Sequence, residues 1–266
     1  MTEPSERAPS LLDRLLSGQR AGVAALVVAV AALVVALAPY ATGTDFGSRV
    51  RAYLVQNPEV LREVSVALDQ KAQQQQIADN RQKAAEVTAR VAANPSLIAV
   101  DAGDPAFGPA DARVTVIEYF DFRCPGCKAT APEVLRLMQA HPDVRFVFKD
   151  WPILDGAGPG PSHYAARAAL AAHQQGKYLG VFQDLMAEPA LSPAVIDGVL
   201  AANGVSLPAA EAAMGSPAVA RLLAGTQTSA MTMQLIGTPT FFVNGKALES
   251  IQPEALDRAI REAKAG

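Results

Sequence analysis

The sequence predicts an α/β domain that follows an apolar N-terminal helix and a polar helical stalk. Residues 21–41 form an almost unbroken apolar run without a charged side chain. Residues 45–94 are polar, rich in Gln, Ala, Arg and Glu, and helical in pattern. From about residue 97 onward, short β-branched and aromatic runs alternate with helical patterns. This alternation is typical of an α/β domain.

The composition excludes several classes of protein. The chain has 266 residues, 50% hydrophobic and 18% charged, with a formal net charge of -3, which suits one or two globular domains. The charge balance excludes nucleic acid as a partner, because proteins that bind it carry a basic excess. The apolar fraction excludes a disordered chain. Two cysteines exclude a disulfide-rich scaffold, and the three histidines lack the spacing of metal ligands, so no metal site is predicted.

Residues 21–41 are predicted to anchor the protein in a membrane. An apolar helix of about 20 residues crosses a bilayer, and three arginines precede the run (Arg7, Arg14 and Arg20). Positive charge favours the cytoplasmic side, so residues 1–20 are predicted to be a cytoplasmic tail. The alternative is a signal peptide cleaved after Ala36-Leu37-Ala38, which leaves a soluble periplasmic protein. In both cases the chain after about residue 42 lies in the cell envelope, outside the cytoplasm.

Residues 45–94 are predicted to form one or two amphipathic helices. Leu54, Leu61 and Leu68 lie seven residues apart, and Val64 falls between two of them. Apolar residues at this spacing can pair with copies of the same helix, which predicts a homo-oligomer. The alternative is a spacer that only lifts the next domain off the membrane. The run Gln73–Gln76 interrupts the apolar pattern and argues against a very stable coil.

The remaining chain contains four predicted strands, over residues 114–120, 144–148, 240–243 and 246–249. Helices are predicted over residues 128–141, 162–175 and 178–186, in shorter pieces to residue 230, and from Pro253 to the end. A linker punctuated by Pro105, Gly108 and Pro109 precedes the first strand. Asn244-Gly245 is a strong signal for a hairpin between the last two strands.

The two cysteines of the chain, Cys124 and Cys127, directly follow a predicted strand and begin a predicted helix. Free N–H groups at a helix N-terminus stabilise a thiolate, which is the reactive form of cysteine. We therefore expect an exposed Cys124 of low pKa to attack disulfides and Cys127 to resolve the mixed disulfide. A structural disulfide across so short a loop would stabilise the fold little, and two inert thiols would oxidise outside the cytoplasm.

Two motifs around these cysteines resemble a known family. Residues 120–128 (FDFRCPGCK) and, downstream, residues 237–245 (GTPTFFVNG) are similar to those of DsbA-type thioredoxin-fold disulfide oxidoreductases. The resemblance covers about residues 97–264. Residues 52–61 (AYLVQNPEVL) resemble the N-terminal helical region of ScsC-like members. In those envelope proteins the region mediates oligomerisation, and several of them act as isomerases.

The resemblance implies a thioredoxin fold over residues 97–266, with a helical subdomain inserted at about residues 160–232 between the second and third strands. It assigns the nucleophile to Cys124 and the resolving role to Cys127. It also implies that the Cys124–Cys127 disulfide takes the place of a cofactor. Thr238-Pro239 matches the loop whose cis proline faces the disulfide and whose preceding backbone pairs with a substrate strand.

Further positions follow from the same resemblance. Pro125 and Gly126 fill the dipeptide that tunes the redox potential. Many strongly oxidising relatives have a histidine at Gly126, so its absence here argues against a strongly oxidising potential. Glu118 lies six residues before Cys124, where the family carries a buried acid that can relay the proton of Cys127.

Three more side chains are candidates near this site. Lys149 ends the second strand and is expected to be the charge partner of Glu118, although either residue could also be an exposed charge at a strand edge. Met231 and Met233 are expected either to fill core gaps or to line an apolar substrate surface near Pro239.

The sequence therefore predicts a thiol–disulfide oxidoreductase, anchored in the inner membrane and facing the periplasm. Its expected partners are cysteine-containing secreted proteins and a membrane redox protein that resets the active site. Oxidase and isomerase remain open. The alternative from another class is a non-catalytic envelope chaperone or binding module that uses the same apolar surface.

Overall fold

A computed structural model describes residues 19–41, 46–156 and 159–266. Residues 1–18 of the predicted cytoplasmic tail therefore lie outside the described part of the chain. The chain divides into two compact units, Met1–Gln73 and Gln74–Gly266. Each unit is described by itself below.

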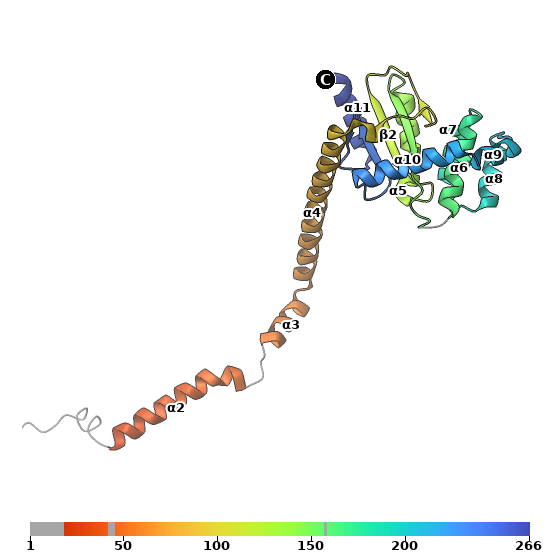
Figure 1. Cartoon of the computed structure of the whole chain (residues 1–266). Coiled ribbons are helices and arrows are strands. Elements are labelled where there is room, and N and C mark those ends of the chain that lie inside the picture. Colours follow the sequence, from red (N-terminus) through yellow and green to blue (C-terminus); the bar gives the residue numbers. More distant parts are fainter. Residues whose placement is uncertain (1–18, 42–45, 157–158) are drawn as a thin grey trace, which may run out of the picture. The chain divides into compact units, whose positions relative to one another are not determined.

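The first unit is helical where the structure describes it, and α4 continues into the second unit (Figure 1). Its elements are α2 (Gln19–Ala41), α3 (Phe46–Gln56) and the first half of α4 (Pro58–Ala93). Pro58 begins α4, at a position where a missing N–H breaks no helical hydrogen bond. Three apolar residues of the predicted stripe are exposed, by 54% at Leu61, 49% at Val64 and 62% at Leu68. In the described part of the chain, no helix is both long and apolar enough to cross a membrane, and the anchor stays a prediction.

A five-stranded sheet forms the centre of the second unit, in the order β1-β3-β2-β4-β5. The strands are β1 (Ala106–Phe107), β2 (Thr115–Phe120), β3 (Arg145–Asp150), β4 (Thr240–Val243) and β5 (Lys246–Ala247). β2 and β3 are parallel, whereas β4 runs antiparallel to β2. The β4–β5 hairpin turns at Asn244 and Gly245, whose φ angles of 46° and 82° suit the predicted turn.

The strand β1 lies inside the segment that the sequence indicated as a linker. It pairs antiparallel with the edge of β3. Gly108 follows it with a φ of 95°, and a Cβ there would lie 2.1 Å from the carbonyl oxygen of Val144. The residue after β1 must therefore be glycine, which explains one of the signals that predicted a linker.

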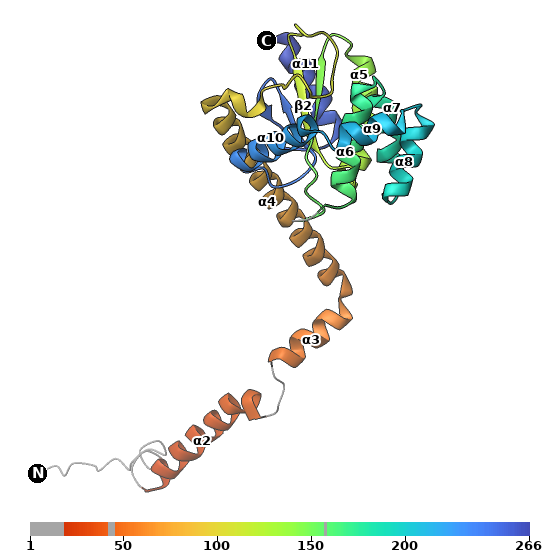
Figure 2. The same cartoon turned by 45° about the vertical axis from the view of Figure 1, so that its right-hand side comes forward.

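Helices cover both faces of this sheet (Figure 2). On one face Phe120 and Phe148 pack with α5 (Pro125–Ala140), α6 (Pro161–Gln174) and α7 (Tyr178–Ala187). On the other face Ile117 and Tyr119 pack with α10 (Pro217–Met233) and with the second half of α4. Alternating side chains of β2 thus enter two separate cores.

The second half of α4 is part of the folded domain. Ala84, Val87 and Val91 are buried, at 8%, 7% and 4% exposure, and Val87 and Val91 contact the sheet core. These positions repeat at i, i+3 and i+7, which places them on one face of a helix. The predicted stalk, residues 45–94, is therefore divided between the two units at Gln73 and Gln74.

The helices between β3 and β4 occupy the position expected for the inserted subdomain. They are α6, α7, α8 (Pro193–Ala202), α9 (Leu207–Met214) and α10. α8 and α9 pack on α6, at the end of the domain away from α4 (Figures 1 and 2). The chain ends in α11 (Pro253–Ala265), which packs against α5 and β4.

Candidate active site

Cys124 lies at the N-terminus of α5, at the position that caps the helix. The preceding loop is fixed by Asp121, whose buried carboxylate accepts hydrogen bonds from the backbone of Arg123 (2.8 Å), the backbone of Leu154 (3.0 Å) and the hydroxyl of Ser162 (2.8 Å). The backbone N–H of Cys124 donates to the carbonyl of Asp121 at 3.0 Å. The strand β2 and this loop therefore set the position of the first thiol.

Both cysteines are free thiols. Cys124 is 9% exposed, less than the sequence suggested, and Cys127 is fully buried at 0%. The difference follows from their places on α5, because Cys127 lies within the first turn and faces the core. A substrate disulfide can thus reach Cys124 but not Cys127.

The loop before β4 meets Cys124 across the site. The Thr238–Pro239 peptide bond is cis, and Sγ of Cys124 lies 3.0 Å from the carbonyl oxygen of Thr238, to which it donates when it is protonated. A Cβ on Gly126 would lie 3.1 Å from Cδ of Pro239 and 3.7 Å from Sγ of Cys124. Gly126 therefore allows the proline to approach the first turn of α5, a steric role that the sequence alone did not indicate.

The two thiols have opposite acidities. The pKa of Cys124 is lowered to about 5, first by a hydrogen bond from the Cys127 thiol, then by a hydrogen bond with Thr238 and by the backbone N–H groups of Cys127 and Gly126, which together outweigh the opposing effect of burial. The pKa of Cys127 is raised, first by burial, then by its hydrogen bond to Cys124 and by the charge of Glu118. At neutral pH the thiolate is therefore held at Cys124 and the proton at Cys127.

Glu118 lies in β2 and faces the same core as the thiols. It is 1% exposed, and neither carboxylate oxygen has a hydrogen-bond partner among the described residues. Burial raises the pKa of Glu118 to about 8, with a smaller contribution from the charge of Cys124. A carboxyl group with this pKa can gain or lose a proton near neutral pH.

The expected pairing of Lys149 with Glu118 is wrong. Glu118 pairs with Phe148 across the parallel strands and Tyr119 pairs with Lys149, so the side chains of Glu118 and Lys149 lie on opposite faces of the sheet. Lys149 instead donates to the carboxylate of Asp104, and to the carbonyl oxygen of Ala99 at 2.9 Å. Lys149 therefore holds the segment before β1 and leaves Glu118 without a cation.

Of the two expectations for Met233, the structure confirms that it fills a core gap and contradicts the placement on a substrate surface. Met233 is 0% exposed and packs with Ala230 and the sheet core, because this face of α10 turns inward. Met231 lies on the other side of α10 and is 64% exposed, but it does not line the groove described next.

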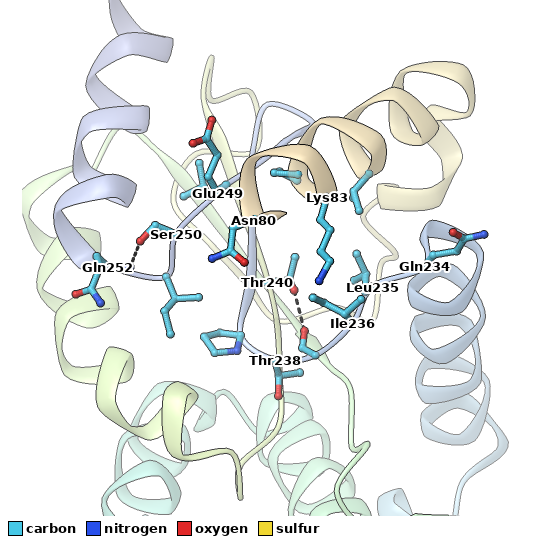
Figure 3. Close-up of a pocket in the computed structure, with 17 residues that line it drawn as sticks. Asn80, Lys83, Gln234, Leu235, Ile236, Thr238, Thr240, Glu249, Ser250 and Gln252 are labelled. Carbon is cyan, nitrogen blue, oxygen red and sulfur yellow. Dashed lines mark hydrogen bonds between the residues drawn. The ribbon is translucent and has the colours of Figure 1, made fainter. Parts of the chain in front are cut away.

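A groove of about 440 Å³ lies beside the cis-proline loop (Figure 3). Its lining includes residues 234–240 before and within β4, residues 247–252 after β5, and one face of α4. Lys83 and Asn80 extend from α4 over this groove in Figure 3. The contribution of α4 was not predicted from the sequence. The apolar spacing of Ala84, Val87 and Val91 in a polar helix is the signal that indicates a segment packed on the domain.

Two family models match this chain. A model described as thioredoxin matches residues 100–262, which include both cysteines and the cis-proline loop. A model described as the copper resistance protein ScsC N-terminal domain matches residues 44–75, which include α3 and the beginning of α4.

Similar proteins of known structure share the fold. A thioredoxin-like oxidoreductase from Silicibacter pomeroyi is 32% identical, with a TM-score of 0.58 over 62% of this chain and 95% of that protein. A linker-deletion variant of ScsC from Proteus mirabilis is 22% identical, with a TM-score of 0.59 over 85% of this chain and 96% of that one. At that identity, the second likeness concerns the fold alone.

A curated relative is much longer. The Na(+)/H(+) antiporter NhaA 1 of Salinispora arenicola is 34% identical over 165 residues, which are 61% of this chain but only 25% of the antiporter. The chain thus spans about a quarter of the length of that relative. From the family match over residues 100–262 and the fold, the chain belongs to the thioredoxin family, and residues 44–75 resemble the ScsC N-terminal domain.

Proposed function

We propose that this protein exchanges disulfides with cysteine-containing proteins in the cell envelope, with Cys124 as the nucleophile. The observation that carries the proposal is the unequal pair of thiols, in which Cys124 has a pKa of about 5 and the Cys127 proton is held in the core. Such a pair presents one thiolate to a substrate and keeps the second thiol in reserve.

In the first step of the reductive direction, the Cys124 thiolate attacks one sulfur of a substrate disulfide. A bond forms between Cys124 and that sulfur, the substrate disulfide breaks, and the other substrate sulfur leaves as a thiolate. The backbone next to Pro239 is exposed to pair with an extended substrate segment. Because Cys124 becomes neutral in the mixed disulfide, its contribution to the raised pKa of Glu118 disappears.

In the second step, Glu118 in its carboxylate form accepts the proton of Cys127. The Cys127 thiolate then attacks Cys124, a disulfide forms between the two cysteines, and the substrate leaves as a thiolate. The substrate has been reduced by two electrons and the enzyme oxidised by two. The same two steps in reverse order oxidise a substrate dithiol to a disulfide.

Two observations bear on the physiological direction. A stabilised Cys124 thiolate favours the reduced enzyme, and this favours donation of disulfides to substrates. The exposed stripe of Leu61, Val64 and Leu68 favours self-association. Several active sites near one substrate raise the effective concentration of a second thiol, which suits an isomerase. The reduction potential of the Cys124–Cys127 pair distinguishes these roles.

The proposed location is the envelope, with the protein anchored through residues 21–41 or released after cleavage of that segment. A membrane protein that exchanges electrons with the Cys124–Cys127 pair would then restore the active site after each turnover.

The proposal is tested by insulin reduction and by refolding of a scrambled disulfide protein. We expect the full chain to catalyse both and the Cys124→Ser variant to catalyse neither. If the two proteins are equally inactive but equally suppress aggregation of an unfolded protein, the protein is a chaperone rather than an oxidoreductase.

A further inference from the structure

The groove beside the cis-proline loop continues directly from the reactive thiol. Pro239 and Ile251 both line it, and both lie against Gly126, at 3.1 Å and 3.6 Å from a Cβ built there. The same Cβ would lie 3.7 Å from Sγ of Cys124. A substrate cysteine bonded to Cys124 therefore places its neighbouring residues at the entrance of the groove.

The walls of the groove differ in chemistry. On one side Ile236 and Ile251 are exposed, by 76% and 40%, and offer apolar surface to a peptide. On the other side α4 contributes Asn80 and Lys83, which extend over the groove in Figure 3. An extended peptide advances about 3.3 Å per residue, so a peptide held at the thiol can continue along the groove toward the α4 wall.

The ammonium group of Lys83 in the groove has no carboxylate partner among the described residues. The carboxylate of Glu249 is paired with Arg81 at 3.2 Å. Lys83 has no ion pair or hydrogen bond to any described residue and is exposed. Its cation is therefore available to a ligand, and the complementary group on a peptide is a carboxylate.

We propose that α4 forms one wall of the substrate site and that Lys83 selects cysteine-containing segments with Asp or Glu a few residues from the reacting cysteine. This inference rests on the proposed function and names its substrate class. It also gives α4 two roles, because the half that follows Gln73 binds substrate and the half that precedes it carries the exposed stripe.

The test uses the full chain with Cys127→Ser, so that the mixed disulfide persists. Each peptide carries one cysteine joined by a disulfide to 5-thio-2-nitrobenzoate. A single Glu or Gln is placed at one position in each peptide, chosen from the four residues before and the four residues after the cysteine. Attack by Cys124 on the peptide sulfur forms the Cys124–peptide disulfide, and the electron pair of the broken bond leaves on the coloured nitrobenzoate thiolate. The readout is the ratio of the rate constants for each Glu and Gln pair.

We expect Glu to be favoured about two- to five-fold at one or more positions, the range of a partly exposed ion pair. The ratio should fall with added salt. It should approach one in Lys83→Gln and invert in Lys83→Glu. Lys71→Gln is the matched control, because Lys71 lies on α4 outside the groove and its loss should leave the ratio unchanged.

Two results would overturn the role of Lys83. One is a Glu-to-Gln rate ratio of one at every peptide position, measured with the protein that retains Lys83. The other is a Glu-to-Gln rate ratio that is the same in Lys83→Gln as in Lys71→Gln. If the protein that retains Lys83 reacts with no peptide and not with the small disulfide 5,5′-dithiobis(2-nitrobenzoate), the proposed function itself fails, and the inference fails with it.

Discussion

The substitution Glu118→Gln isolates the energetic effect of the buried carboxyl group. In the folded protein the pKa of Glu118 is about 8, against 4.5 for an unperturbed glutamate. The folded state thus binds this proton more tightly than the unfolded state. Stability is therefore lost as pH rises from about 4.5, and the loss is complete above about pH 8.

The size of the effect follows from the difference in pKa. A difference of about 3.5 units corresponds to about 5 kcal/mol over the whole range, at about 1.4 kcal/mol per unit. Between pH 5 and pH 7 the loss is about 2 to 3 kcal/mol. Glutamine keeps the shape and the unpaired polar atoms but cannot ionise. The stability of Glu118→Gln relative to the unmodified protein should therefore increase by about 2 to 3 kcal/mol over this interval.

The measurement is denaturant unfolding of both reduced proteins at several pH values from 5 to 9. Cys124 contributes an opposite slope, because its pKa of about 5 is below the usual 9, so its stabilisation grows as pH rises between these values. The contribution of Cys124 is present in both proteins. It cancels to first order when the free energy of unfolding of one protein is subtracted from that of the other. A difference that stays constant between pH 5 and pH 7 would refute the claim that the fold holds Glu118 protonated.

The remaining predictions concern the thiols, the corrected ion pair and the stalk. Cys127→Ser should accumulate mixed disulfides with envelope proteins, seen as adducts on non-reducing gels, whereas accumulation only in Cys124→Ser would reverse the assignment of the nucleophile. Lys149→Met leaves the buried Asp104 without its cation and should lower the free energy of unfolding by about 3 kcal/mol. The rate of Cys124 alkylation should stay unchanged, and a slower rate would restore a link between Lys149 and the thiols. Replacing Leu61, Val64 and Leu68 by Gln should lower both the molar mass measured by light scattering and the isomerase activity, and if neither changes the first half of α4 is only a spacer.

Local signals in the sequence were sufficient to predict the strands that carry the site. β2 and β3 begin within one residue of the predicted positions, and β4 agrees at both ends. The placement of Cys124 at a helix N-terminus followed from the order of strand and helix alone. The roles of the cis-proline loop and of Glu118 came from the resemblance, since no spacing rule links residues so far apart.

Two of the errors share a physical cause, which is that side chains close together in the sequence face opposite sides of a strand or a helix. Lys149 stands next to Asp150, yet adjacent residues of a strand face opposite cores, and the register of β2 against β3 decides which residues meet. Met233 and Met231 differ in the same way on a helix. The strand β1, with two residues, is too short to give a periodic signal.

The contact between Cys124 and Thr238 joins parts of the chain that are 114 residues apart. During synthesis, a chain that has been made only through α5 contains both cysteines but neither the loop that faces them nor β4. Its thiols then lack the surface on which substrates are held. The reactive centre is therefore completed only when nearly the whole chain has been synthesised and folded.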